Sequence, residues 1–154
     1  MKLNTKYHGA IEFEKENIIT FKKGLPGFEN LKEYIIFPLE ENKIFSIMQS
    51  LEDTSVGIPV LSPFSICNDY EFSIPQEMTE SLCIKSQEDV LVLNTVTINS
   101  NYKSITTNLK APIIINIKDK IGEQIILDND KYEIKHPIFT EPSSIFTTVI
   151  SILS

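Results

Sequence analysis

The chain has 154 residues, of which 42% are hydrophobic. A chain of this length can bury about 68–70% of its unfolded surface in a single domain, so it needs neither disulfides nor a structural metal. Its two cysteines, Cys67 and Cys83, are too few for a disulfide framework. Residues 1–6 lack the apolar segment of a signal peptide, and no apolar run is long enough to span a membrane. We therefore expect a cytoplasmic protein with no membrane association.

The charge of the chain bears on whether its partner is a nucleic acid or a protein. Acidic residues outnumber basic ones by 21 to 14, the net charge is −7, and every basic residue is a lysine. Nucleic acids are bound mainly by lysine and arginine on phosphates, so an acidic surface without arginine argues against direct nucleic-acid binding. Two interpretations remain: the acidity serves a basic protein partner, or it only keeps the protein soluble.

Short apolar or alternating segments separated by turn residues recur along the whole chain. Such segments predict strands, since alternation every second residue is typical of a half-buried sheet. They comprise residues 1–7, 10–14, 18–21, 34–39, 43–50, 56–61, 89–99, 102–107, 113–116, 124–127 and 131–135. Residues 34–39 and 43–50 form a hairpin pattern, and in the last segment Tyr132 and Ile134 are expected to point inward. The pattern predicts an all-β fold, a small antiparallel barrel or sandwich.

The segment around which the fold is expected to form is 113–116. Three consecutive isoleucines without alternation indicate a strand that is covered on both faces. Pro112 cannot donate a ladder hydrogen bond and suits the strand entrance, while Asn108 and Asn116 suit the flanking turns.

Residues 24–29 read Gly-Leu-Pro-Gly-Phe-Glu. The two glycines permit positive φ angles, and the proline between them has a fixed φ, so a structured turn is predicted. Leu25 and Phe28 can fold back as apolar plugs. Whether this turn closes a barrel or contacts a partner stays open.

At most one short internal helix is expected, at residues 74–82, where Ile74, Met78 and Leu82 share one face. Residues 141–154 form an apolar extension to a domain of residues 1–140. Phe146, Val149, Ile150 and Leu153 have the spacing of a helix face, but the many β-branched residues favour a strand, so both alternatives remain. This stripe is too apolar to leave in water, and we expect it to pack on the barrel or to cover a partner groove.

Residues that could carry chemistry are few. His8 and His136 have no ligand-spaced companions, so no metal site is predicted. Cys67 is more typical of a structural cysteine than of a nucleophile. The pair Gly24 and Gly27 lacks the Lys-Ser/Thr of a phosphate-binding loop. We expect a binding module with no catalytic site, no cofactor and no small-molecule substrate.

Four motifs in this order resemble the flagellar assembly factor FliW family over residues 1 to about 138. They are the turn 24–29, the strand 45–50 ending in Met-Gln-Ser, Glu88-Asp89-Val90, and residues 108–113 with Asn116, Gln124 and Tyr132. The apolar tail is not part of the family core. The resemblance implies structural roles for the residues of the first and last motifs: Gly24, Leu25, Pro26, Gly27, Phe28, Asn108, Leu109, Ala111, Pro112 and Asn116.

The resemblance further implies a small β-barrel that binds two proteins in mutually exclusive fashion. These are flagellin and CsrA, the repressor of flagellin translation, so the protein would be a CsrA antagonist, and a monomer when free. Projecting residues in turns and strand ends are expected to contact the partners: Glu29, Glu40, Glu41, Gln49, Glu52, Asp53, Asp69 and Tyr70. The alternative is a carbohydrate-binding or hydrolytic β-sandwich, which would need exposed aromatic side chains or paired carboxylates in a cleft.

Overall fold

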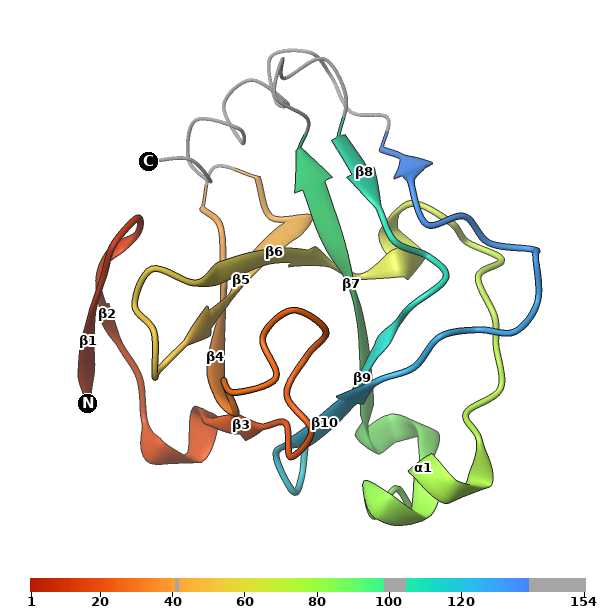
Figure 1. Ribbon diagram of the computed structural model, residues 1–154, viewed down its shortest axis with the longest axis horizontal. Helices are drawn as coiled ribbons and strands as arrows, with labels where there is room; N and C mark the ends of the chain where they lie inside the picture. The colour runs from red at the N-terminus through yellow and green to blue at the C-terminus, as the bar shows by residue number, and fades with distance from the viewer. Residues whose placement is uncertain (41, 99–104, 139–154) are drawn as a thin grey trace.

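The computed structural model describes residues 1–40, 42–98 and 105–138. Within them, seven strands close into a barrel (Figure 1). Around the ring they are β3 (Ile19–Thr20), β4 (Glu33–Pro38), β5 (Phe45–Ser50), β6 (Gly57–Leu61), β7 (Val90–Ile98), β9 (Ile113–Asn116) and β10 (Ile121–Gln124). Closure occurs because β7 pairs with β6 and also with β9, and β10 pairs with β3. The all-β prediction is confirmed, and the barrel alternative is the one observed.

Most neighbours in the ring are antiparallel, including the predicted hairpin, in which Tyr34 pairs with Ser50 and Pro38 with Ser46. One seam differs from the expected antiparallel pattern. The strands β3 and β10 run parallel and are joined at the single pair Thr20 and Ile121. This seam is the shortest pairing in the ring.

Four further strands lie outside the ring. The hairpin of β1 (Lys2–Thr5) and β2 (Gly9–Glu12) forms its own sheet, and the His8 ring meets the Phe37 ring of β4 edge-on at 5.7 Å. The strand β8 (Ile105–Thr107) pairs with the upper part of β7, and β11 (His136–Pro137) pairs with β8. The 3-10 turns are Lys15–Asn17, Pro63–Ser65 and Gln87–Asp89.

The strand β9 is covered on both faces, as its unbroken apolar run predicts. Ile113 and Ile115 lie in the cluster that fills the barrel, which also holds Tyr34 and Met48. Ile114 faces the other way and packs in the outer cluster beneath the helix α1 (Gln76–Ser81). The flanking turns are also as expected: the Asn108 side chain accepts the Lys110 amide at 3.1 Å, and the Asn116 side chain accepts the Lys118 amide at 2.9 Å.

Two predicted strands are misplaced. The one expected at 124–127 is β10, which begins three residues earlier, because Gly122 is a strand residue and not a turn glycine. A Cβ at Gly122 would lie 2.6 Å from the Phe21 ring, so glycine is needed there to leave room for that ring. The strand expected at 131–135 is wrong: Tyr132 is buried, but Ile134 is 60% exposed, and pairing starts only at His136.

Five predictions fall wholly or partly outside the described residues. These are the tail at 141–154, the end of the domain at 1–140, the last residue of the strand at 89–99, the beginning of the strand at 102–107, and Glu41.

Candidate partner-binding cleft

The turn at residues 24–29 joins β3 to β4 and lies across the centre of the barrel opening (Figure 1). Gly24 has a φ of +66° and Gly27 a φ of +86°, and the Phe28 amide donates to the Leu25 carbonyl at 2.7 Å. Proline followed by a glycine of positive φ is the pattern of a type II turn. Leu25 is buried in the barrel cluster while Phe28 is 37% exposed. The turn therefore plugs the barrel with one side and presents the other to solvent.

The helix α1 covers the outer face of β9. As predicted, Met78 and Leu82 are buried and Ile74 packs beside them. The helix ends at Ser81, and Cys83, two residues later, has a φ of +55°, which is unusual for a residue other than glycine.

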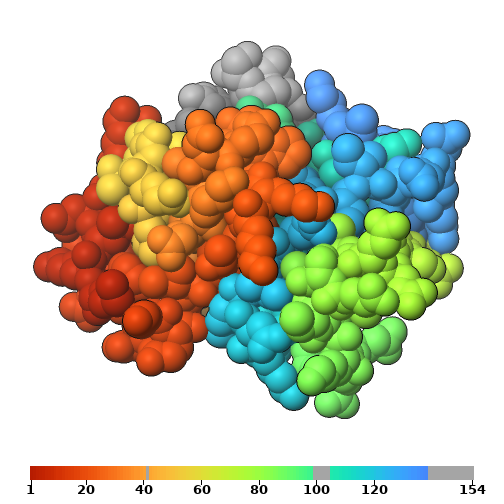
Figure 2. Space-filling model, turned by 60° about the horizontal axis from the view of Figure 1, so that its bottom comes forward, coloured from red at the N-terminus to blue at the C-terminus, as the bar shows by residue number. Residues whose placement is uncertain are grey.

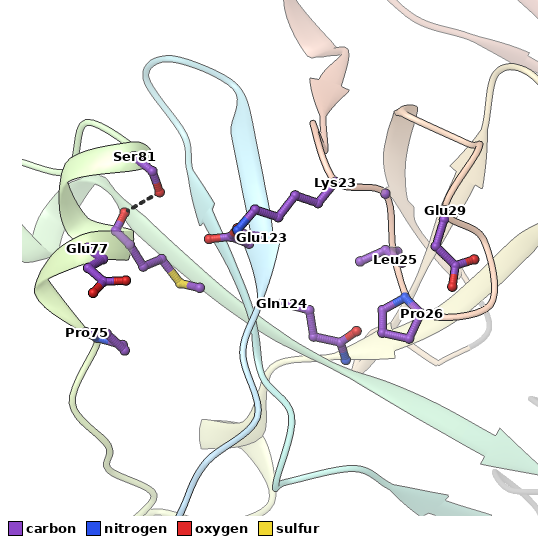
Figure 3. Close-up of a pocket in the computed structure, with 11 residues that line it drawn as sticks. Lys23, Leu25, Pro26, Glu29, Pro75, Glu77, Ser81, Glu123 and Gln124 are labelled. Atoms are coloured by element: carbon purple, nitrogen blue, oxygen red, sulfur yellow. Dashed lines mark hydrogen bonds and ion pairs between the residues drawn. The ribbon is translucent and has the colours of Figure 1, made fainter.

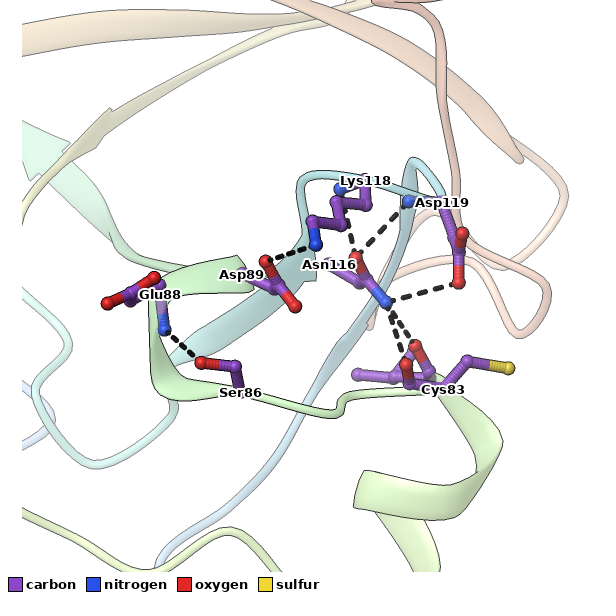
Figure 4. Close-up of polar contacts among 8 residues, drawn as sticks. Cys83, Ser86, Glu88, Asp89, Asn116, Lys118 and Asp119 are labelled. Atoms are coloured by element: carbon purple, nitrogen blue, oxygen red, sulfur yellow. Dashed lines mark hydrogen bonds and ion pairs between the residues drawn. The ribbon is translucent and has the colours of Figure 1, made fainter.

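The Asn116 side chain holds the end of α1 in place (Figure 4). Its amide nitrogen donates to the carbonyl oxygens of Leu82 at 2.7 Å and Cys83 at 3.2 Å, while its oxygen accepts the amides of Lys118 and Asp119. One buried asparagine thus joins the end of a barrel strand to the end of the helix.

A cleft of about 630 Å³ lies between the turn and α1, with β10 at its base. Figure 2 shows the orange residues of the turn and the green residues of the helix on opposite sides of a hollow. We call it the turn–helix cleft, and it is lined by Lys23, Gly24, Leu25, Pro26, Glu29, Pro75, Glu77, Met78, Ser81, Glu123 and Gln124. Its surface combines apolar side chains with carboxylates.

The cleft carries an excess of negative charge. Glu29 stands on the turn side and Glu77 on the helix side, while Glu123 forms a 2.6 Å ion pair with Lys23 (Figure 3). The hydrogen bond between Lys23 and Glu123 is the larger cause that raises the pKa of Lys23, and the negative charge of the Glu123 carboxylate is the second. Hydrogen bonds from its own amide and that of Gly27 lower the pKa of Glu29. Three carboxylates and one ammonium therefore leave two negative charges in excess.

The structure brings only some of the predicted contact residues near this cleft. Glu29 lines it. The Glu52 carboxylate accepts the amides of Lys32 at 2.5 Å and Glu33 at 2.8 Å, so it lies at the same end of β4 as the turn. Asp53 accepts the Ser55 hydroxyl at 2.6 Å and the Ser55 amide at 3.0 Å, and these bonds lower the pKa of Asp53.

Two other predicted acids, Glu40 and Asp69, lie away from the cleft. Glu40 follows the opposite end of β4. Asp69 accepts the Cys67 thiol at 3.2 Å, which lowers the pKa of Asp69. Burial first, and this hydrogen bond second, raise the pKa of Cys67, so its thiol is a poor nucleophile near neutral pH.

Two of the predicted contact residues do not face solvent. Gln49 is 1% exposed and donates to the carbonyl oxygens of Ser50 and Thr54. Tyr70 is 3% exposed and donates to the Leu109 carbonyl at 2.6 Å. In each residue the side-chain donor bonds to backbone carbonyl oxygens, so this arrangement does not support the expected contacts of these two residues with a partner.

Sequence reasoning missed Glu77 and the Lys23–Glu123 pair. Glu77 could have been found, because it lies off the helix face that Met78 and Leu82 bury. The ion pair could not, because it depends on the pairing of β3 with β10, which are about a hundred residues apart.

Side chains that could bind a metal are scattered in the part of the chain that the structure describes. There, no three His, Cys, Asp or Glu side chains are grouped so that they could hold a metal ion. Helices in the same residues are too short or too polar to cross a membrane. What the cleft offers is apolar area bordered by hydrogen-bond acceptors and negative charge, which is a surface for binding.

Comparison with known proteins gives a consistent result. The family model described as FliW protein matches residues 2–138. A flagellar assembly factor FliW of Clostridium tetani is 65% identical over 141 residues, covering 92% of this chain and 97% of that protein. One of Clostridium botulinum (strain Okra) is 57% identical and covers 92% and 99%.

A solved structure agrees with these relatives. The crystal structure of a flagellar assembly factor FliW superposes with a TM-score of 0.81 at 36% identity, covering 92% of this chain and 99% of that one. The family model, the relatives and the shared barrel together show that this chain belongs to the FliW family of flagellar assembly factors.

Proposed function

We propose that this protein is a cytoplasmic, non-catalytic antagonist of CsrA that binds either CsrA or flagellin, and not both. Free flagellin would occupy the protein and leave CsrA to repress flagellin translation. Export of flagellin would release the protein to bind CsrA and to relieve repression. The protein would act as a monomer that forms these complexes in turn.

The turn–helix cleft is the main support for this proposal. It is walled by the turn 24–29, one of the four segments that carry the family resemblance, and it presents apolar area together with excess negative charge. A basic protein is the natural complement of such a surface, since opposite charge speeds encounter and apolar area slows dissociation. Of the two proposed partners, we assign the cleft to CsrA.

Mutual exclusion has a thermodynamic signature. Whatever factor flagellin removes from the affinity for CsrA, CsrA must remove from the affinity for flagellin, because coupling between binding equilibria is reciprocal. We expect matched losses of about 5- to 150-fold, and larger ones if the surfaces overlap. Calorimetric titration of each partner in the presence and absence of the other, at fixed salt, measures both factors. A ternary complex in which both affinities are unchanged would refute the switch.

Reversing charge in the cleft should weaken CsrA binding chiefly through the association rate. For Glu77→Lys and Glu29→Lys we expect association to slow roughly 3- to 10-fold at low salt, and the rate to depend less on ionic strength. Stopped-flow or surface-plasmon measurements over a range of salt concentrations test this.

The matched control for these variants is Glu12→Lys. It makes the same change of charge on an exposed residue of β2, outside the barrel and not among the expected contact residues. If this control slows CsrA as much as the cleft variants do, the overall charge of the protein and not the cleft governs encounter. If none of the three has an effect, the acidity only aids solubility.

A further inference from the structure

A second hollow lies on the other side of the turn. This apolar groove has a volume of about 420 Å³ and lies between the turn, the middle of β7 and the residues that follow β10. Two large apolar side chains at its edge reach solvent, Phe28 at 37% and Ile126 at 72% exposure. Exposed apolar side chains gathered at a groove are typical of an interaction site.

The groove differs from the turn–helix cleft in its chemistry. None of the residues that line it carries a formal charge, and Ile58 and Ala111 add to its apolar lining. The cleft, by contrast, is lined by three carboxylates and an ammonium. An occupant of the groove should therefore be apolar and uncharged.

The sequence of this chain contains a segment of that kind. After Glu141 no charged residue occurs up to Ser154, and Phe146, Val149, Ile150 and Leu153 recur at a spacing of three and four. The family model ends at residue 138, so this segment lies beyond the part of the chain that matches the family. Such a stripe is costly to leave in water.

The segment starts close to the groove. Pro137 of β11 pairs with Thr106 of β8, and Thr106 pairs with Thr97 of β7, which lines the groove. Neighbouring strands are about 4.8 Å apart, so β11 is roughly 10 Å from the edge of the groove. Between Ile138 and Phe146 there are seven residues, which span roughly 10 Å if helical and more than 20 Å if extended. Either conformation is long enough to turn back.

We propose that residues 139–154 dock their apolar stripe into the apolar groove of their own chain. A segment tethered this near to a groove has an effective concentration in the millimolar range, far above that of a separate partner in a cell. The proposal does not depend on CsrA or flagellin. Docking would place the segment against Leu25 and Pro26, which also line the turn–helix cleft.

Disulfide trapping in the full chain tests this proposal. In a background with Cys67→Ser and Cys83→Ser, the pair Ile126→Cys and Val149→Cys is compared with Ile134→Cys and Val149→Cys. Ile134 is 60% exposed and does not line the groove. The control pair closes the shorter loop, so chain length alone would favour the control and not the groove pair. We expect the groove pair to form an intramolecular disulfide at least about tenfold faster than the control. Equal rates would overturn the proposal.

Two further readouts keep the test independent of cysteine reactivity. In methyl NMR of the full chain, Ile150→Asp should shift the Ile58 and Ile126 methyl signals and leave those of Ile117 and Ile134 in place. Shifts at Ile117 or Ile134 without shifts at the groove would overturn the proposal. So would a trapping rate that rises with protein concentration and gives crosslinked dimers, because the occupant would then be a second copy of the chain.

Discussion

The variant Gly24→Ala should lose about 3 kcal/mol of unfolding free energy. A φ of +66° costs a residue with a Cβ about 1–2 kcal/mol. The new Cβ would also lie 2.6 Å from the carbonyl oxygen of Glu29 and 2.7 Å from its Cα. These are backbone atoms and cannot rotate away, so the turn must shift at a further cost of about 1–3 kcal/mol. Urea unfolding followed by circular dichroism measures the loss.

Gly27→Ala is the matched control, in the same turn. Gly27 also has a positive φ, of +86°, but a Cβ there meets nothing within 4 Å. Gly27→Ala should therefore lose only the unfolding free energy that a positive φ costs a residue with a Cβ, about 1 kcal/mol. If the two variants are equally stable, the close approach of Gly24 to Glu29 is not what the turn requires. Because Gly24 lines the cleft, only its variant should also weaken CsrA binding.

Asn116→Ala should destabilise the protein by a similar amount, about 3 kcal/mol. The side chain is 2% exposed and satisfies two carbonyls at the end of α1 and two amides in the turn after β9. Removing it leaves several backbone groups unpaired, and each buried one costs about 1–3 kcal/mol unless water reaches it. Hydrogen exchange should increase most at Lys118 and Asp119 and in the last turn of α1.

Asn108→Ala provides the comparison. Its side chain is only half-buried and accepts one amide, that of Lys110. A loss of about 1 kcal/mol is expected, without faster exchange in α1. Equal losses for the two variants would mean that the connection between β9 and the helix contributes little.

The parts of the fold that sequence reasoning predicted well are those in which a local pattern has one structural meaning. Three β-branched isoleucines without alternation, between a proline and an asparagine, favour a strand that is covered on both faces, and β9 is one. The turn at 24–29 is a second such case, because its two glycines adopt the positive φ angles that the turn needs. Gly122 is the contrary case, because the reason for a glycine there is the Phe21 ring, a hundred residues earlier in the chain.

The candidate site was harder to predict than the fold. Glu29 was identified because the turn itself is a motif, but the cleft also needs Glu77 and Glu123, which come from two other regions of the chain. Gln49 is among the expected contact residues, but the fold buries it, because its side chain donates to the backbone carbonyls of Ser50 and Thr54. Burial of a polar side chain depends on partners that one sequence does not reveal.

The seam between β3 and β10 has a consequence for synthesis of the protein on the ribosome. Thr20 cannot meet Ile121 until about a hundred further residues have been made, and contacts between such distant segments form late. The cleft takes its walls from the turn after β3, from α1 and from β10, so it is absent from every shorter nascent chain. The cleft is therefore complete only in chains whose residues 123 and 124 have left the exit tunnel.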